Sequence, residues 1–103
     1  MQDRQQPRAA YYIYFMLARE ADAVKIGVTH DLDGRRKSIQ TCCPFEVEII
    51  AAVPFGARQA ATKQERRLHH HFDALWMRTE WFRFSQPLRD LVTHLREGGE
   101  LLI

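Results

Sequence analysis

The sequence predicts a small α/β domain of the α+β type, in which a mostly antiparallel sheet of three strands plus a short edge strand is flanked by three helices. Two neighbouring runs, residues 11–17 and 24–29, are rich in β-branched and aromatic side chains and are separated by a polar break, as in a β-hairpin. Two later segments, residues 57–75 and 85–97, repeat apolar side chains at helical spacing.

The length and composition are those of one globular domain. From the 103 residues we expect a disordered tail at 1–9, the folded domain at 10–97 and a short C-terminal tail at 98–103. No apolar run approaches the roughly 20 residues that span a bilayer, and the N-terminus lacks the apolar core of a signal peptide. We therefore expect a soluble, cytoplasmic protein that makes no membrane contact.

Cysteine usage and charge add two weaker expectations. Cys42 and Cys43 are adjacent, a spacing at which a disulfide would be strained, so we expect reduced thiols. The net charge is +2, which permits nucleic-acid binding without demanding it.

The first hairpin has two different faces, because strand side chains alternate. One face carries the apolar side chains of Ile13, Phe15, Leu17, Val24, Ile26 and Val28. The other face carries Tyr12, Tyr14, Lys25 and Gly27. A phenol, an ammonium group and a glycine bare enough for a ligand to approach share that second face, so we expect it to be the floor of a site rather than a second core.

The next segment predicts a helix that Asp31 caps and that contains Gly34 at a cost of about 1 kcal/mol relative to alanine. Leu32 and Ile39 point inward, and Arg35 lies on the same face because it stands three and four residues from them. An arginine there either binds an anion or a carboxylate, or extends its head to water.

A third strand is expected at residues 46–53, ended by Pro54-Phe55-Gly56, and a long helix at 57–75. Glu65 lies on the inward side of that helix, and His69 lies on its neighbouring edge. Arg35 and Glu65 are thus two inward charged groups on different helices. They form a buried ion pair, or each is satisfied by a ligand.

The C-terminal part predicts a short aromatic edge strand at residues 80–84 and a last helix. Ser85 caps this helix, Pro87 occupies its first turn and Gly98-Gly99 ends it. Its apolar stripe consists of Leu88, Leu91, Val92 and Leu95.

Most catalytic motifs are missing from the sequence. His69, His70 and His71 cannot converge on one ion, because adjacent helical residues point about 100° apart. The chain has no P-loop, Rossmann or G-x-S-x-G signature. The remaining tyrosine, lysine, arginine and glutamate suit phosphodiester hydrolysis, in which a carboxylate holds a hard cation and an arginine holds a phosphate.

The order of several motifs resembles the GIY-YIG endonuclease superfamily, and most closely its short phage and bacterial branch, whose second motif reads KIG. The matching stretches are Tyr12-Ile13-Tyr14, Lys25-Ile26-Gly27, Arg35 eight residues later, Glu65-Arg66-Arg67-Leu68-His69 and Glu80-Trp81-Phe82. Thr79 departs from the pattern, since it stands where the family usually has a glycine.

The resemblance implies roles for particular residues. Tyr14 would polarise or deprotonate the attacking water, Arg35 would hold the scissile phosphate, and Glu65 would bind one Mg²⁺ or Mn²⁺ ion. We add Lys25 as a fourth catalytic residue, because the hairpin register places it near Tyr14, where its charge would lower the phenol pKa. Residues expected to contact substrate are Tyr12, Gly27, Thr29, Arg36 and His69.

The expected function is therefore that of a metal-dependent DNA endonuclease of the GIY-YIG type. The alternative is a nucleic-acid- or protein-binding module that keeps this fold without useful turnover. A domain of this size has little surface for sequence choice, so a protein partner or a homodimer would supply specificity.

Overall fold

The computed structural model describes residues 10–101, so the predicted tail at 1–9 and the last two residues lie outside the described part of the chain. The strands are β1 (Tyr11–Ala18), β2 (Ala23–Thr29), β3 (Val47–Phe55), β4 (Trp76–Arg78) and β5 (Trp81–Arg83). The α-helices are α1 (Leu32–Cys42), α2 (Arg58–His71) and α3 (Gln86–Arg96), with short 3-10 turns η2 (Arg19–Ala21) and η3 (Asp73–Leu75).

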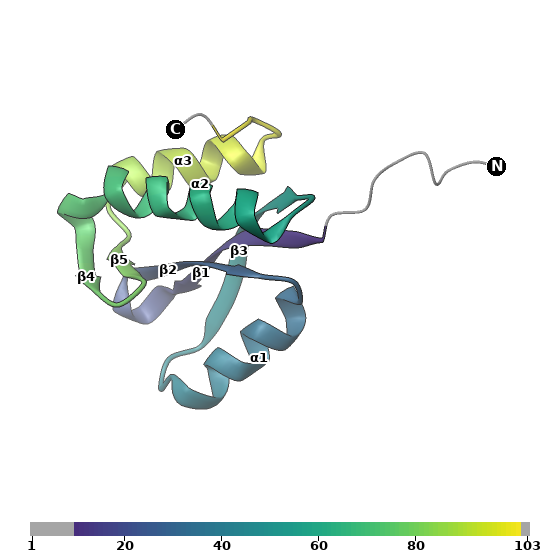
Figure 1. Cartoon of the computed structure of the whole chain (residues 1–103). Coiled ribbons are helices and arrows are strands. Elements are labelled where there is room, and N and C mark those ends of the chain that lie inside the picture. Colours follow the sequence, from purple (N-terminus) through teal and green to yellow (C-terminus); the bar gives the residue numbers. More distant parts are fainter. Residues whose placement is uncertain (1–9, 102–103) are drawn as a thin grey trace.

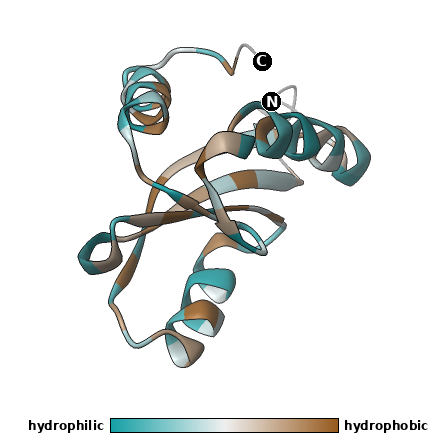
Figure 2. Ribbon diagram, turned by 90° about the vertical axis from the view of Figure 1, so that its left-hand side faces the viewer, coloured by the Kyte–Doolittle hydropathy of each residue, from teal (hydrophilic) through white to brown (hydrophobic). Residues whose placement is uncertain are grey.

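The five strands form one antiparallel sheet in the order β3-β1-β2-β5-β4. Helices α2 and α3 cover one face of this sheet, and α1 lies alone on the other (Figure 1). The same three layers are visible in the perpendicular view, where α1 is separated from the other two helices by the strands (Figure 2). The α+β class predicted from the sequence is confirmed.

The expected apolar face of the hairpin is confirmed. Its side chains pack beneath α2 and α3 with Ala61 and Leu68 of the former and Leu88 and Val92 of the latter. This is the larger of two apolar clusters on opposite faces of the sheet and holds most of the buried apolar residues. Its register follows directly from the period of two in a strand.

The opposite face is also a core over part of its length, contrary to expectation. Met16, Ala18 and Val47 are buried there against Leu32 and Ile39 of α1. Tyr14 belongs to this cluster and has no exposed surface. The polar site therefore occupies only the end of this face near Gly27 and Thr29, and a small second core fills the rest.

The predicted strands differ from the observed ones in three places. β3 continues through Pro54 to Phe55, which is possible because β3 is an edge strand where proline leaves no ladder partner unpaired. The short strand β4 was not predicted. Consequently β5, expected at the edge of the sheet, pairs with β2 on one side and with β4 on the other.

The helix boundaries follow local chemistry. The Asp31 carboxylate accepts a hydrogen bond from the Gly34 backbone N–H at 3.0 Å, as the predicted N-cap requires. A Cβ atom at position 34 would collide with that carboxylate, so this glycine makes room for the cap. The long helix ends at His71 rather than near Leu75, and Ser85 caps α3 without a side-chain hydrogen bond.

Both cysteines are free thiols, as predicted. Among the described residues, no helix combines the length and the apolar character needed to cross a membrane.

Candidate functional site

A polar cavity of about 530 Å³ opens where the α1 side of the sheet meets the start of α2. Arg35 of α1 lines it, together with Arg58 and Glu65 of α2 and Glu80 from the turn between β4 and β5. The cavity thus receives two cations and two carboxylates from three separate segments. Arg35 and Glu65, predicted to be inward charged groups, lie in the same cavity.

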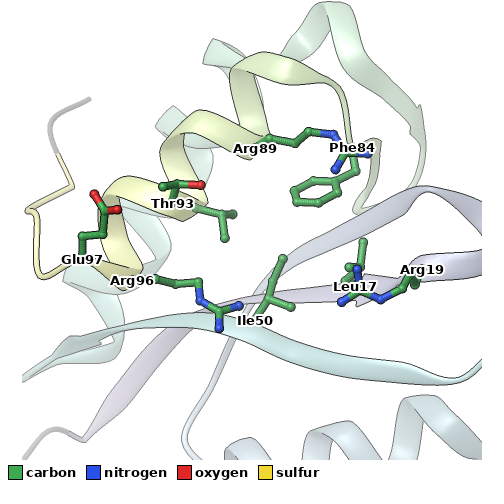
Figure 3. Close-up of a pocket in the computed structure, with 9 residues that line it drawn as sticks. Leu17, Arg19, Ile50, Phe84, Arg89, Thr93, Arg96 and Glu97 are labelled. Atoms are coloured by element: carbon green, nitrogen blue, oxygen red, sulfur yellow. The ribbon is translucent and has the colours of Figure 1, made fainter.

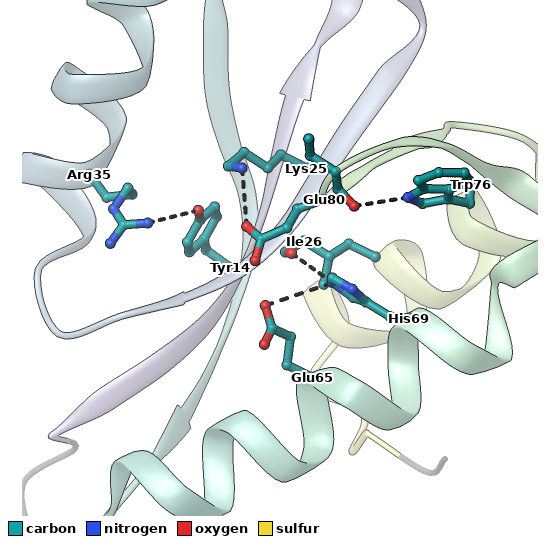
Figure 4. A network of polar contacts seen from close by, with 9 residues as sticks. Tyr14, Lys25, Ile26, Arg35, Glu65, His69, Trp76 and Glu80 are labelled. Carbon is teal, nitrogen blue, oxygen red and sulfur yellow. Dashed lines mark hydrogen bonds and ion pairs between the residues drawn. The ribbon is translucent and has the colours of Figure 1, made fainter.

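Arg35 contacts the phenol of Tyr14 rather than Glu65. Its Nη1 donates to the Tyr14 hydroxyl at 3.5 Å, a long and therefore weak hydrogen bond, and its guanidinium lies 6.0 Å from the ring centroid (Figure 4). No carboxylate of the described residues lies within ion-pair distance of Arg35. The guanidinium is half-buried and keeps donors available for an anion.

The pKa of Tyr14 lies at about 12, above its usual value of 10. Burial is the largest cause, and the charge and hydrogen bond of Arg35 oppose it. We expected Lys25 to lower this pKa, but the pKa is raised, and Lys25 is not among the causes of the shift. The Lys25 ammonium donates a hydrogen bond to Glu80 Oε1 at 3.1 Å and forms an ion pair with this carboxylate (Figure 4).

Glu65, His69 and Glu80 form a compact cluster whose potential ligand atoms all lie within 4.8 Å of one another. The pKa of Glu65 is raised from 4.5 to about 7, first by burial and then by the charge of Glu80 and a hydrogen bond to it. Two carboxylates at this distance repel one another when both are ionised, so they share a proton or need a cation.

His69 is held by the backbone of β2 beside Glu65. Its Nε2 lies 3.0 Å from the Ile26 carbonyl oxygen, which can only accept, so Nε2 carries the proton. The same nitrogen lies 3.7 Å from Glu65 Oε2, too far for a hydrogen bond, and the ring packs edge-on against Phe82 at 4.9 Å. His69 thus adjoins the carboxylate pair, while His70 and His71 are exposed on the outside of α2.

Glu80 is the site residue that the sequence prediction missed, although it begins the E-W-F motif. The turn that carries it is unusual, because Thr79 adopts a positive φ of 46°. The Thr79 carbonyl accepts the indole N–H of Trp76 at 2.9 Å, and the Glu80 carbonyl accepts from the Ile26 N–H at 3.0 Å. These two hydrogen bonds fix the turn against β2 and aim the carboxylate at Glu65.

Gly27 serves the protein rather than a ligand. It stands opposite Tyr14 in the β1–β2 register, and a Cβ atom built there would lie 2.5 Å from the tyrosine hydroxyl oxygen. The space that we expected a ligand to enter is filled by the phenol. The Tyr14 ring therefore packs directly on Gly27, because this residue has no side chain. This contact explains how a large aromatic side chain is fully buried on a sheet face.

Of the other predicted contact residues, only Thr29 lines the cavity. Its buried hydroxyl exchanges hydrogen bonds with the Asp31 backbone and so fixes the start of α1. Arg36 lies 3.7 Å from Asp33 on the outside of the helix, and Tyr12 is half-buried opposite Thr29. Lining residues that were not predicted are Tyr11, Val28, His30, Arg58 and Thr62.

A second hollow, of about 400 Å³, lies between α3 and the sheet (Figure 3). Its side chains Arg19 and Arg89 are already paired, the first with Glu48 at 3.0 Å and the second with Asp22 at 2.8 Å. Arg89 also stacks on Phe84 at 4.5 Å. These contacts indicate packing of α3 rather than a reactive site.

Fold and site together define a small α+β domain with a polar cavity that is lined by Arg35 and by the carboxylates of Glu65 and Glu80. The chain belongs to the T5orf172 domain family, whose model matches residues 11–97. This is a phage-associated domain found in an endonuclease context, and membership points to a nuclease-like or DNA-binding role. Neither the curated proteins nor the solved structures give a significant match.

Proposed function

We propose that this protein is a metal-dependent nuclease of the GIY-YIG type that hydrolyses phosphodiester bonds in DNA. The observation that carries the proposal is that Arg35 and the Glu65–Glu80 pair line one open cavity. A phosphodiester needs a cationic group for its non-bridging oxygens and a charge-neutralising group near its leaving oxygen. This cavity offers the first directly and the ligands for the second.

The carboxylate pair fits a hard divalent cation. Glu65 and Glu80 supply oxygen ligands, which Mg²⁺ and Mn²⁺ prefer. The pKa of Glu65 is raised first by burial and then by the charge of Glu80, and a bound cation would offset both effects. We assign both glutamates as ligands rather than Glu65 alone. When bound, the cation would polarise the phosphate and stabilise charge on the leaving oxygen.

Arg35 holds the scissile phosphate. Its contact with Tyr14 is weak at 3.5 Å, so a phosphate, which forms stronger charge-assisted hydrogen bonds, displaces it at little cost. When a phosphate binds, the guanidinium exchanges its hydrogen bond to the Tyr14 phenol for hydrogen bonds to the phosphate. This exchange would also release the Tyr14 hydroxyl, which is buried and contacts Arg35 in the free protein.

Tyr14 then orients the attacking water as a neutral phenol. With a pKa of about 12 it keeps its proton at neutral pH, so it directs the water through a hydrogen bond and does not act as the resting base. Lys25 is a positioning residue, since it holds Glu80, and His69 packs beside Glu65.

The alternative of a binding module without turnover is favoured by one observation, the complete burial of Tyr14. A single experiment separates the two functions. End-labelled duplex, branched and single-stranded DNA, and RNA of the same sequence, are incubated with the purified protein in Mg²⁺, in Mn²⁺ and in EDTA. A nuclease cuts at least one DNA substrate only with the metal, whereas binding without cutting in every metal supports the module and overturns the proposal.

A further inference from the structure

The exposed face of α2 carries cations without acidic partners. Lys63, Arg66, Arg67, His70 and His71 line a shallow hollow of about 670 Å³ on this face. The only acidic residue of the helix is Glu65, which is turned toward the cavity. Among residues 10–101, no carboxylate lies within ion-pair distance of Lys63, Arg66 or Arg67.

Exposed cations elsewhere in the described chain are often neutralised locally. On α1, Lys37 lies 3.1 Å from Asp33, and Arg36 approaches the same carboxylate. Arg19 and Arg89 are paired with acids of other elements. Arg78, Arg83 and Arg96 are also exposed without an ion pair in the described chain, but they lie on three different elements. The cations of α2 instead gather in one hollow, a local concentration of charge that the small net charge of +2 conceals.

The cationic face is continuous with the candidate site. Arg58, at the start of α2, lines the site cavity, and Arg66 directly follows Glu65 and acts on its pKa. At 100° per residue, Arg66 lies between the inward side of the helix and the outer side that holds Lys63 and His70. Cationic side chains are therefore found from the cavity round to the outer side of the helix.

We infer that this face, which we call the α2 track and define as Arg58, Lys63, Arg66, Arg67 and His70, binds the sugar–phosphate backbone of double-stranded nucleic acid beside the scissile bond. This inference rests on the proposed nuclease function. The thirteen residues from Arg58 to His70 are separated by twelve steps of 1.5 Å and so span about 18 Å, the length along the duplex axis of about five phosphates of one strand.

A duplex fits this surface better than a single strand does. Single-strand binders pair a cationic groove with aromatic side chains on which bases stack. The exposed residues of α2 include no phenylalanine, tyrosine or tryptophan. Contacts of this kind read backbone charge without reading sequence, so the track supplies affinity and register but little sequence preference.

The test compares two triple variants with the same change in net charge. Lys63→Gln/Arg66→Gln/Arg67→Gln removes the track, and Arg19→Gln/Lys37→Gln/Arg89→Gln removes three exposed cations that already have acidic partners. Each is made in the parent and in the Glu65→Gln background. Binding of a fluorescent duplex is followed by anisotropy in the Glu65→Gln background over a series of KCl concentrations.

The track variant should bind at least ~10-fold more weakly, and the slope of log Kd against log salt should fall by about 2.7, because each lost phosphate contact removes about 0.9. The control variant should keep the slope of the parent. In single-turnover cutting, the track variant should need more protein for half-maximal rate, with a maximal rate within about twofold of the parent.

Three results would overturn the inference: an unchanged slope in the track variant, an equal loss in the control, or parent binding that is tighter to a single strand or to polyglutamate than to duplex. A failure of the nuclease proposal is seen separately. If the parent binds duplex through the track but cuts no DNA in any metal, the surface assignment stands and the proposed chemistry falls.

Discussion

The Lys25 ammonium lies 3.1 Å from Glu80 Oε1, between residues 55 positions apart in the sequence. This contact turns the lysine away from the phenol that it was expected to activate and toward the carboxylate pair. The strand register predicted that Lys25 stands opposite or diagonal to Tyr14, and the diagonal position is observed. Register does not determine which neighbouring group the ammonium contacts. The partner that it contacts is Glu80, which lies far away in the sequence, in the turn between β4 and β5.

The carboxylate pair leads to a prediction about the pKa of Glu65 in the metal-free protein. Lys25 lowers this pKa and Glu80 raises it. Lys25→Met should therefore move the pKa of Glu65 above about 7, and Glu80→Gln should move it down toward 4.5. Carbon-13 NMR titration of the Glu65 side-chain carboxyl measures both shifts. Movement in the same direction in the two variants would contradict the assignment of the pair.

The same group makes stability depend on pH. The folded pKa of Glu65, about 7, exceeds its usual value of 4.5, so protonation favours the folded state. This stabilisation is complete below about pH 4.5 and is lost as the pH rises through about 7.

The test is urea unfolding of the parent and of Glu65→Gln in EDTA at pH 5 and at pH 7.5. Between these pH values the parent should lose unfolding free energy relative to the glutamine variant. Parallel pH profiles for the two proteins would exclude the shift, and Mg²⁺ at pH 7.5 should stabilise only the parent.

The packing of Tyr14 on Gly27 predicts the cost of adding one methyl group. Gly27→Ala places a Cβ 2.5 Å from the phenol oxygen, so the ring must move, and we expect a loss of about 1–3 kcal/mol in unfolding free energy together with most of the cutting activity. Gly56→Ala is the matched control, since its Cβ meets no atom within 4 Å. Urea denaturation that places both variants within error of the parent would show that Tyr14 does not depend on the bare glycine.

Arg35 should be needed for turnover rather than for stability. It has a weak contact with Tyr14 and no acidic partner in the described chain, so Arg35→Ala should cost less than about 1 kcal/mol of stability. The cutting rate should fall at least ~100-fold, as expected when a group that stabilises phosphate charge is removed. Loss of a buried ion-pair partner would instead cost about 3–5 kcal/mol, and such a result in a thermal or urea melt would restore the Arg35–Glu65 pair.

The sequence predicted those features that depend on neighbouring residues in the chain, such as strand alternation, helix periodicity and helix capping. The alternating hairpin faces, the Asp31 cap and the inward positions of Arg35 and Glu65 all follow from strand and helix periods. Even Gly34, which seemed costly inside a helix, has a local reason in the cap it accommodates.

The rest depended on tertiary contacts that carry little sequence signal. A three-residue strand such as β4 is too short for periodicity, and the positive φ of Thr79 is rare for a β-branched residue. Both features position Glu80, so missing them meant missing half of the carboxylate pair. The burial of Tyr14 likewise required knowing that α1 closes over it, which reverses the expected direction of its pKa shift.

The most direct test of the proposed site compares cutting of labelled duplex DNA by the parent, Glu65→Gln and Glu80→Gln over a range of Mg²⁺ concentrations. Both substitutions keep the size of the side chain and remove a charge that a hard cation requires. If these two glutamates hold a cation, the parent should cut DNA only with Mg²⁺ and each variant should cut at least ~100-fold more slowly. All three proteins should still bind duplex. Cutting by either variant at the parent rate, with the same dependence on Mg²⁺, would contradict a cation held between these two glutamates.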